Sequence, residues 1–472
     1  MVCGTTSGAG KSLLATALAR SYARRGYRVA PFKAQNMSNN ARVVRDGEMG
    51  SAQYFQALAA RCVPDVRMNP VLLKPEGDTR SQVIVLGQRV DALACMEWRA
   101  RAAHLWPTVC ACLAELRAEF DVLIIEGAGS PAEINLQASD IVNMRVAAEA
   151  RAATLIVADI DRGGAFAHLY GTHALLPPEH RALIRGFVLN KFRGDAALLA
   201  PGPRTLQDLT GIETLGVLPM WREHGLPDED GVFDARPSGS GFAIAIVAYP
   251  HISNLDEFAP LRRVPGVSLC WARQAQTVAS ADLLILPGSK HVAADLDWLR
   301  ATGLAGAILR HAESGKPTLA ICGGLQMLGE EITDPHGVEG AARGLALLPY
   351  CTEFQMRKRH RHGRHVLRGT SGYWAPLAEI GFDGYEIRHG ETRLNTCAAG
   401  APTPVLPDRC GWQHGATLGL YVHGMFENPA VMRALFGAQT PTLDDTLDGL
   451  ADFIEAHIPE RTLVSLLDAD PV

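Results

Sequence analysis

The first twelve residues of the chain restrict its fold more than any other segment does. Gly4 to Ser12 have the sequence GTTSGAGKS, which follows a short apolar start and precedes an amphipathic stretch that ends near Gly26. Glycines at a strand–helix junction let backbone N–H groups turn inward, and the helix adds its positive end, so such a segment binds phosphate. A glycine turn without a nucleotide is the alternative, but Gly-Lys-Ser at the junction disfavours it. The expected ATP contacts are Gly4, Thr5, Thr6, Ser7, Gly8, Ala9, Gly10, Lys11 and Ser12.

The spacing of this loop departs from the usual pattern. Five residues separate Gly4 from Gly10, whereas the common phosphate loop has four between its outer glycines. The longer spacing resembles the variant of dethiobiotin synthetase and its relatives, which phosphorylate carboxylates. Thr6 stands where the ParA-like branch has an extra lysine. The strand before the loop is cut short at Met1, so the natural start of the chain is expected to lie upstream.

Composition narrows the class of protein. The 472 residues suit two domains, and 47% of them are hydrophobic. A formal net charge of −5 disfavours general affinity for nucleic acid. No apolar run approaches the roughly 20 residues that cross a bilayer, and a secretion signal is lacking, so we expect a cytoplasmic protein without a membrane partner. Ten cysteines without a C-x-x-C pair are expected to be reduced. The basic run from Arg357 to His365 is predicted to be a solvated loop, with contact to an acidic substrate as the alternative.

Short apolar runs alternate with amphipathic ones along both halves of the chain. This alternation predicts two doubly wound α/β domains with parallel sheets. Charged residues, Pro, Gly and Ser between Trp221 and Gly241 indicate a linker. The clearest expected strands are 122–125, 154–158, 187–189, 243–248, 283–286, 318–321 and 418–422. The expected organisation is a first domain over 1–225, a linker over 226–241, a second domain over 242–442 and a C-terminal helix and tail over 443–472.

Polar side chains follow several strands of the first predicted sheet. Lys33, Glu126, Asp159, Asp161 and Asn190 all come at strand ends. Ligands of parallel sheets bind at the carboxyl ends of the strands. One such side chain is usually a solvated cap, but several that converge on a phosphate loop predict a site.

The second half contains a candidate nucleophile. The apolar run 318–321 leads into Cys322-Gly323-Gly324 and then a helix. This arrangement resembles a nucleophile elbow, in which a tight turn exposes the side chain and the helix start favours thiolate. A buried structural cysteine is the alternative. A cysteine nucleophile needs a base nearby, and His423, in GLYVHG at the end of another apolar run, is the expected partner.

Longer segments carry a family resemblance that spans nearly the whole chain. They are PFKAQNMSNNARVV, GEMGSAQ, MNPVLLKP, EGAGSPAEINL, ADIDRGGAFA and LNKFRGD, in this order. Together they resemble the cobyric acid synthase family, whose members amidate corrin-ring carboxylates in the cobalamin pathway. The resemblance implies a dethiobiotin-synthetase-like first domain that uses ATP and a class I glutamine amidotransferase second domain.

The resemblance also implies residue roles. Lys11 and Lys33 would bind phosphates, and Asn190 would contact the adenine. The implied magnesium ligands are Ser12, Glu48 and Glu126. The run that would face the corrinoid is Gln35, Asn36, Met37, Ser38, Asn39 and Asn40.

In the second domain the family pattern adds an oxyanion site and one departure. Leu286 to Lys290 would offer backbone N–H groups to the oxyanion, with Gly288 as the first choice and Gly323 as the second. The segment YEIRHG from Tyr385 would be structural or would line the substrate. Class I enzymes have a glutamate two residues after the histidine, whereas this chain has Met425. What orients His423 therefore stays open, with Glu427 as a candidate.

The implied activity is a two-site, glutamine-hydrolysing ligase. Its implied substrate is adenosylcobyrinic acid a,c-diamide, amidated at carboxylates b, d, e and g with MgATP and glutamine, without a tightly bound cofactor. The nearer alternative is a cobyrinic acid a,c-diamide synthase, against which QNMSNN and MNPVLLKP argue. The remoter one is a ParA-class switch with a decayed amidotransferase domain. Homo-oligomer formation, the order of amidations and the ammonia route stay open.

Overall fold

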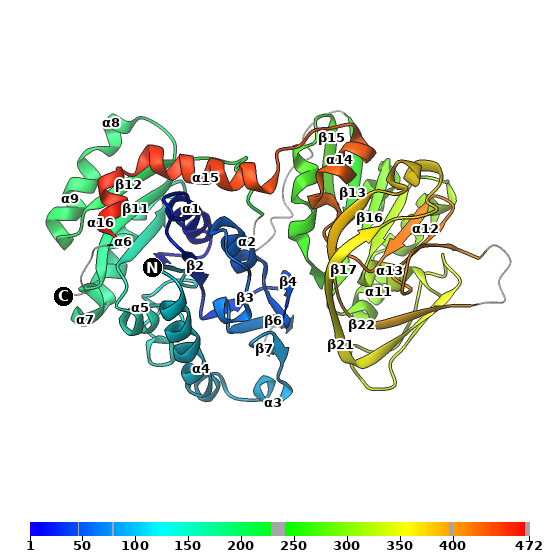
Figure 1. Ribbon diagram of the computed structural model, residues 1–472, viewed down its shortest axis with the longest axis horizontal. Helices are drawn as coiled ribbons and strands as arrows, with labels where there is room; N and C mark the ends of the chain where they lie inside the picture. Colours follow the sequence, from blue (N-terminus) through cyan, green and yellow to red (C-terminus); the bar gives the residue numbers. More distant parts are fainter. Residues whose placement is uncertain (46, 78–79, 228–240, 396–400, 468–472) are drawn as a thin grey trace.

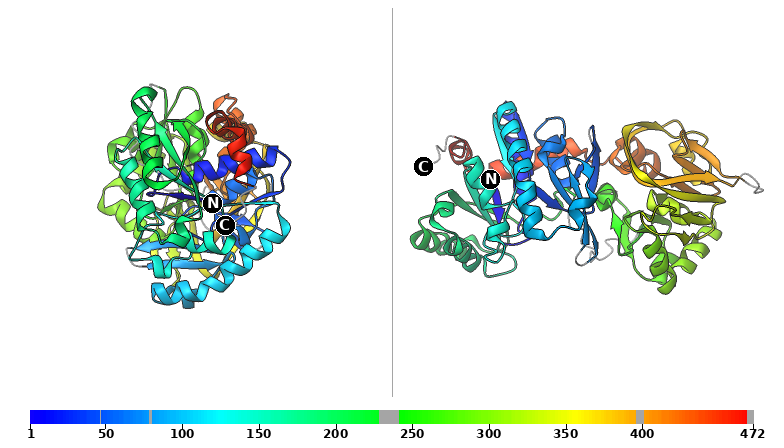
Figure 2. Two further views of the ribbon diagram at one scale, coloured as in Figure 1. Left: turned by 90° about the vertical axis from the view of Figure 1, so that its left-hand side faces the viewer. Right: turned by 90° about the horizontal axis from the view of Figure 1, so that it is seen from below.

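The protein has two lobes that lie side by side (Figures 1 and 2). The computed structural model describes residues 1–45, 47–77, 80–227, 241–395 and 401–467. One lobe holds the first half of the chain and the other most of the second half. Within these residues, no helix combines the length and apolar character needed to cross a membrane.

The first domain is built on a parallel sheet in the order β2-β9-β1-β10-β11-β12. Its strands, in that order, are Val29–Phe32, Val122–Ile125, Val2–Gly4, Thr154–Asp159, Ile184–Phe192 and Thr214–Pro219. A parallel bridge between Val2 and Glu126 joins β9 to β1. The helices are α1 (Lys11–Arg24), α2 (Ser51–Ala59), α3 (Asp91–Ala94), α4 (Trp98–Glu119), α5 (Met144–Ala150), α6 (Ala165–Leu175), α7 (Pro178–Arg181), α8 (Ala196–Leu199) and α9 (Pro201–Thr210). Short 3-10 turns are η1 (Val66–Met68) and η2 (Gln137–Ser139).

Smaller strands of the first domain face the second domain. They are β3 (Gln35–Met37), β4 (Ala41–Val44), β5 (Gly47–Gly50), β6 (Val71–Gly77), β7 (Arg80–Val85) and β8 (Gln88–Arg89). β4 pairs with β5 and packs against β21 and β22 of the second domain. An apolar cluster spans this interface and contains Ala41, Val43, Leu72 and Ile84 with Tyr385 and Ile387. The interface therefore buries side chains from both domains.

The second domain has a larger sheet in the order β15-β13-β16-β18-β25-β24-β23. The strands, in that order, are Val267–Ala272, Phe242–Val247, Leu283–Leu286, Thr318–Ile321, Thr417–Leu420, Gly411–His414 and Thr403–Leu406. Neighbours from β15 to β25 are parallel, and β24 and β23 add antiparallel pairs. The helical segments are η3 (Leu255–Arg263), α10 (Ala275–Ala279), α11 (Val292–Ala301), α12 (Leu304–Glu313), α13 (Gly323–Leu328), η4 (Gly372–Leu377), η5 (Met425–Glu427) and α14 (Pro429–Phe436).

A second sheet of this domain contains the long antiparallel pair β21 and β22 in the order β20-β19-β21-β22. These strands are Ala342–Arg343, Glu331–Thr333, Tyr350–Val366 and Gly381–Leu394, and the small pair β14 and β17 comprises Ile252–Ser253 and Gly288–Ser289. The basic run from Arg357 to His365 lies inside β21, so its prediction as a solvated loop was wrong. Antiparallel pairing with β22 covers Arg359 to His365, and Lys358 lies at the irregularity of the ladder between Phe354 and Arg359, where it donates to Glu48 of the first domain at 2.8 Å.

The C-terminal helices α15 (Leu443–His457) and α16 (Glu460–Ser465) return to the first domain, where α15 lies along α1 (Figure 1). Thr442 and Asp445 form a capping box at the start of α15. The fully buried Arg20 of α1 donates hydrogen bonds to Asp444 and Asp448. The chain thus crosses to the second domain and back.

The predicted strands agree closely with the observed ones. Strand β25 ends at Leu420, three residues before His423, rather than at Val422 as expected. Of the expected linker over 226–241, only Leu226, Pro227 and Gly241 belong to the described residues. The doubly wound α/β fold of both halves is confirmed.

Candidate active sites

The phosphate loop connects β1 to α1 with glycines in conformations that other residues avoid. Gly8 and Gly10 have φ values of 71° and 104°. A Cβ atom on Gly10 would lie 2.0 Å from Asn190 Nδ2, so a side chain at this position would force the loop apart. Asn190 also donates a hydrogen bond of 2.9 Å to the Ala9 carbonyl. The residue expected to contact adenine therefore lies directly against the loop.

Four of the predicted residues come together beside the loop. Ser12 Oγ and Lys33 Nζ donate hydrogen bonds of 2.9 and 3.0 Å to the same oxygen, Glu126 Oε1. Burial raises the pKa of Glu126, but Lys33 and hydrogen bonds from Gln56 and Ser12 outweigh it, so the pKa lies below 4.5. Lys11 Nζ donates to the carbonyls of Thr6 and Gly129. Lys33 and Glu126, which follow the ends of β2 and β9, therefore lie beside the phosphate loop.

The other strand-end acids are engaged nearby. Asp159 Oδ2 lies 2.9 Å from Lys191 Nζ, which also donates to the Gly8 carbonyl at 2.7 Å. Asp161 pairs with Arg193. The Asp159–Lys191 pair therefore contacts the loop from the side of β10 and β11.

The pair of oxygens at Ser12 and Glu126 fits a magnesium ion. In the described part of the chain no three His, Cys, Asp or Glu side chains gather as metal ligands. Mg²⁺ bound with a nucleotide needs only one or two protein oxygens, because phosphates and waters complete its shell. A hydroxyl and an ionised carboxylate in contact, next to a phosphate loop, supply those oxygens.

Glu48, the third expected metal ligand, is not part of this group. Its buried carboxylate pairs with Lys74 and, at 2.8 Å, with Lys358 of the second domain. Burial raises the Glu48 pKa, but Lys358, Lys74 and Lys290 hold it well below 4.5. Glu48 thus pairs with ammonium groups at the domain interface and, unlike Glu126, does not line the cavity at the phosphate loop, so we leave it out of the magnesium site.

A cavity of about 1080 Å³ opens from the phosphate loop. This volume exceeds that of most single-ligand pockets and accommodates a nucleotide together with a larger substrate. Lys33, Gln35, Asn36 and Met37 line it, together with Phe453 of α15. Asn36 Nδ2 donates to Gln53 Oε1 at 3.1 Å, which fixes one residue of this wall.

The rest of the run expected to face the corrinoid follows a different course. Ser38 is buried, and its hydroxyl accepts a hydrogen bond from the Asn40 N–H. Neither Ser38 nor Asn39 belongs to the cavity lining. Asn40 binds the second domain, where its Oδ1 accepts the Leu255 N–H at 2.9 Å. The run therefore leads from the cavity to the domain interface.

In the second domain, Cys322 occupies a strained turn. Its φ and ψ are 52° and −106°, between the end of β18 and the start of α13. A Cβ on Gly323 would lie 2.6 Å from Ser289 N, and one on Gly324 would lie 2.1 Å from the Leu286 carbonyl. The two glycines therefore allow the elbow to pack against the 286–289 turn. The thiol faces the interface strand β22, with Sγ 3.7 Å from the Ile387 carbonyl.

His423 is held on several sides. Its backbone bridges Tyr385, whose ring stacks on the imidazole at 5.2 Å. Its Nδ1 lies 2.8 Å from Glu257 Oε1, and Glu257 Oε2 accepts the Gly424 N–H at 3.0 Å. Burial lowers the His423 pKa, but the charges of Glu257 and Cys322 overcome this and raise it from 6.5 to about 10. The imidazole is therefore protonated at neutral pH and oriented by Glu257.

Glu257 is the carboxylate that contacts His423, where the family pattern would have a glutamate at position 425. The candidate Glu427 does not contact His423 and instead pairs with Arg42. Glu257 lies on η3, 166 residues before the histidine. In the sequence it neither follows an expected strand nor belongs to a recognised motif. Only the acidic pair Asp256-Glu257 within an apolar stretch hinted at it. Gly288, the first oxyanion candidate, lies against the histidine, because a Cβ there would be 3.1 Å from His423 Cε1.

Known proteins resemble both halves of the chain. Residues 1–225 match the family described as "CobQ/CobB/MinD/ParA nucleotide binding domain", and residues 243–431 match "CobB/CobQ-like glutamine amidotransferase domain". A cobyric acid synthase from Variovorax paradoxus (strain S110) is 61% identical over 99% of this chain and 98% of its own length. The chain belongs to the cobyric acid synthase family. Another cobyric acid synthase, from Leptothrix cholodnii (strain ATCC 51168 / LMG 8142 / SP-6), is 60% identical over 99% of this chain and 96% of its own.

Membership in the cobyric acid synthase family confirms the predicted resemblance and decides between the alternatives. Identity of this size along nearly the whole length favours this family over a diamide synthase or a ParA-class switch. The chain is therefore a glutamine-hydrolysing carbon–nitrogen ligase of the cobalamin pathway, with a nucleotide-binding first domain and a glutamine amidotransferase second domain.

Proposed function

We propose that the protein amidates the b, d, e and g carboxylates of adenosylcobyrinic acid a,c-diamide to give adenosylcobyric acid. ATP would activate each carboxylate as an acyl phosphate in the first domain, and glutamine would supply ammonia in the second. The observation that carries the proposal is one continuous segment. Lys33 lies at the phosphate loop, Gln35 to Met37 line the cavity, and Asn40 contacts the glutaminase domain.

In the synthetase site a substrate carboxylate oxygen attacks the γ-phosphorus of ATP, and ADP leaves. Ammonia then attacks the acyl carbon, phosphate leaves with the bonding electrons, and loss of a proton from nitrogen gives the amide. Lys11, Lys33 and the N–H groups of the loop hold the phosphates. Ser12 and Glu126 would hold Mg²⁺, which would supply positive charge to neutralise the phosphates. Asn190 lies close enough to the loop to contact the nucleotide, and Gln35 and Asn36 provide polar groups for the corrinoid.

In the glutaminase site Cys322 attacks the side-chain amide carbon of glutamine. His423, protonated and oriented by Glu257, donates a proton to the leaving nitrogen, so the C–N bond breaks and ammonia leaves. Neutral His423 then takes a proton from water as its oxygen attacks the thioester, which releases glutamate and a proton and returns Cys322 as the thiolate beside a protonated His423. Backbone N–H groups at Gly288 and Gly323 stabilise the oxyanion, because both residues pack beside the Cys322–His423 pair.

Ammonia must reach the synthetase site without protonation, which would remove its nucleophilic lone pair. The position of Cys322 supports a direct route, because its thiol lies beside Ile387, a member of the apolar interface cluster. The other side of this cluster is formed by β4 and by strands adjoining the cavity wall. An apolar passage favours the neutral amine over the ammonium ion.

Mass spectrometry of the corrinoid products tests the proposal. The full-length protein is incubated with the a,c-diamide, MgATP and either glutamine or an ammonium salt. Four successive conversions of a carboxylate to an amide are expected with both nitrogen sources. Fewer than four additions at completion, or product only from the acid that lacks the a and c amides, would contradict the assigned substrate.

A further inference from the structure

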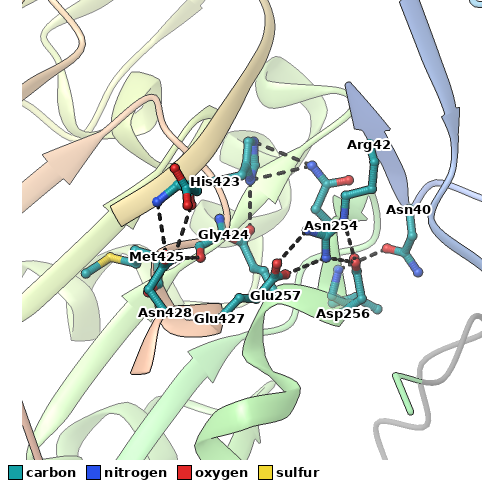
Figure 3. A network of polar contacts seen from close by, with 12 residues as sticks. Asn40, Arg42, Asn254, Asp256, Glu257, His423, Gly424, Met425, Glu427 and Asn428 are labelled. Atoms are coloured by element: carbon teal, nitrogen blue, oxygen red, sulfur yellow. Dashed lines mark hydrogen bonds and ion pairs between the residues drawn. The ribbon is translucent and has the colours of Figure 1, made fainter. Parts of the chain in front are cut away.

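One arginine of the synthetase domain reaches into the glutaminase centre (Figure 3). Arg42, on β4, has a side chain that is only 3% exposed. Its guanidinium donates to Asp256 Oδ2, from Nε at 3.0 Å, and to Glu427 Oε2 at 2.9 Å. Asp256 directly precedes Glu257, and Glu427 is four residues after His423. A single guanidinium therefore joins the two segments that carry the oriented histidine and its carboxylate.

Backbone contacts of the same strand reinforce this junction (Figure 3). Asn254 Oδ1 accepts the Ala41 N–H at 3.1 Å, and the Leu255 N–H donates to Asn40 Oδ1 at 2.9 Å. Asn254 has a left-handed φ of 55°, a conformation that asparagine tolerates, and its Nδ2 lies 3.5 Å from the His423 ring nitrogens. Two consecutive residues at the start of η3, Asn254 and Leu255, therefore form hydrogen bonds with the first domain.

Arg42 also touches the ring that stacks on the histidine. Its guanidinium carbon is 5.1 Å from the centre of the Tyr385 ring, which in turn stacks on His423. Such a contact is attractive, particularly when the cation is withdrawn from water. Three features of the histidine's surroundings, the Glu257 segment, the Glu427 segment and the Tyr385 ring, thus converge on one side chain of the other domain.

We propose that Arg42 is a positioning residue of the glutaminase, which holds Glu257 against His423 so that the Cys322–His423 pair is complete only while the two domains are docked. This inference rests on the proposed Cys322–His423 glutaminase. It goes beyond it by assigning part of that site to the synthetase domain. Ammonia release then depends on the domain that consumes the ammonia.

The physical reason is that Arg42 is the charged partner of a buried carboxylate at this end of η3. Without the guanidinium the Asp256 carboxylate, 2% exposed, would be buried without a charged partner, and the segment would move to hydrate it. Glu257 is the next residue, so its distance to His423 Nδ1 would change with it. A displacement of about 1 Å in a catalytic arrangement lowers rates about 100-fold.

The test is Arg42→Gln in the full-length protein, with glutamine and ammonium as separate nitrogen sources. We expect kcat for glutamine hydrolysis to fall about 100-fold with a nearly unchanged KM for glutamine. Amidation from ammonium should keep its rate, because Arg42 does not line the synthetase cavity. Equal loss with both nitrogen sources, or full glutamine hydrolysis, would overturn the proposal.

Arg263→Gln is the matched control. Arg263 ends the same η3 segment and also connects the domains, because it donates to Thr446 Oγ1 of α15 at 2.8 Å. It does not contact the residues around His423, so glutamine hydrolysis should stay within about threefold of wild type. A similar loss in both variants would mean that general loosening of the domains, and not positioning, explains the effect. Arg42→Lys should recover only part of the rate, because an ammonium cannot bridge two carboxylates as a guanidinium does.

A double-mutant cycle and a pH profile separate positioning from misfolding. If Arg42 acts through Asp256, Arg42→Gln combined with Asp256→Asn should cost no more than the larger single loss, whereas additive losses would refute the link. Cys322, Glu257 and Tyr385 adjoin His423, and the charged groups next to them are Arg42, Asp256 and Glu427. With Glu257 displaced, hydrolysis in Arg42→Gln should decline at lower pH than in wild type, and an unshifted profile would refute positioning.

The outcome for Cys322→Ser distinguishes failure of this inference from failure of the proposed function. Glutamine hydrolysis that survives Cys322→Ser would sink the proposed glutaminase itself. Hydrolysis that requires Cys322 but is untouched by Arg42→Gln would sink only the role of Arg42.

Discussion

The two proposed catalytic centres are built in opposite ways. The phosphate loop is nine consecutive residues, and it opens onto a cavity of about 1080 Å³. The glutaminase centre draws Glu257, Gly288, Cys322 and His423 from four separate segments, and its histidine is fully buried. In addition, Arg42 of the other domain pairs with Asp256, the residue next to Glu257. A centre made from one continuous segment keeps its geometry by itself, whereas a dispersed centre depends on how distant elements pack.

Removal of the nucleophile should separate the activities of the two centres most clearly. Cys322→Ser should lower glutamine-dependent amidation by at least about 10⁴-fold, because a serine hydroxyl beside this histidine is a far weaker nucleophile. Ammonium-dependent amidation should persist, measured as amide additions by mass spectrometry. Cys351→Ser, a partly buried cysteine on β21, is the control and should retain both activities. Joint loss of both activities in Cys322→Ser would mean that the centres are not separate.

A change in the phosphate loop should have the opposite effect, in which amidation is lost and glutamine hydrolysis remains. Lys11→Ala should slow amidation about 10³-fold with either nitrogen source, because phosphate charge in the transition state loses its lysine. Glutamate release from glutamine should continue, since Lys11 lies outside the glutaminase centre. Lys316→Ala, which removes a lysine that binds a carbonyl in the second domain, should leave amidation intact. Undiminished turnover in Lys11→Ala would refute the assignment of the loop.

The dependence of the dispersed centre on a distant carboxylate is tested by Glu257→Gln. Glutamine hydrolysis should fall on the order of 100-fold. The protonated His423 acts as the acid, so wild-type activity should fall as pH rises through its pKa of about 10. Since the Glu257 charge raises this pKa, its removal lowers the pKa, and the variant should lose activity at lower pH. Exposed Glu353→Gln should keep the wild-type profile, and an unshifted profile in Glu257→Gln would show that another group orients the histidine.

The smallest effect is expected where the chain returns to its first domain. Arg20→Met removes the buried partner of Asp444 and Asp448 but touches neither centre. The free energy of unfolding of this domain should fall by about 1–3 kcal/mol, measured by urea denaturation, with unchanged ammonium-dependent kcat. The exposed pair of Arg28 with Asp121 provides the control, and Arg28→Gln should leave the urea midpoint in place. A large loss of amidation in Arg20→Met would mean that the cavity, which Phe453 of α15 helps to line, depends on this ion pair.

Local patterns in the sequence predicted a large part of this molecule. The strands 122–125, 283–286 and 318–321 were expected with the bounds that the structure has. The elbow at Cys322 and the phosphate loop followed from short runs in which turn, strand and helix signals adjoin. The convergence of Lys33 and Glu126 followed from the rule for the ends of parallel strands. Each of these features depends on neighbours within a few residues or on a general property of sheets.

The sequence by itself determined the two folds, the glycine-rich loop between β1 and α1 and the strained turn at Cys322, because these depend on backbone conformations that nearby residues impose. Only the tertiary structure decided that Glu257 orients His423, that Glu48 faces lysines and that Arg42 joins the domains. Glu257 and His423 are 166 residues apart in the chain, Glu48 and Lys358 are 310 apart, and Arg42 and Glu427 are 385 apart. A charged side chain carries no local sign of its partner, since its pairing is set by which surfaces meet when the domains pack.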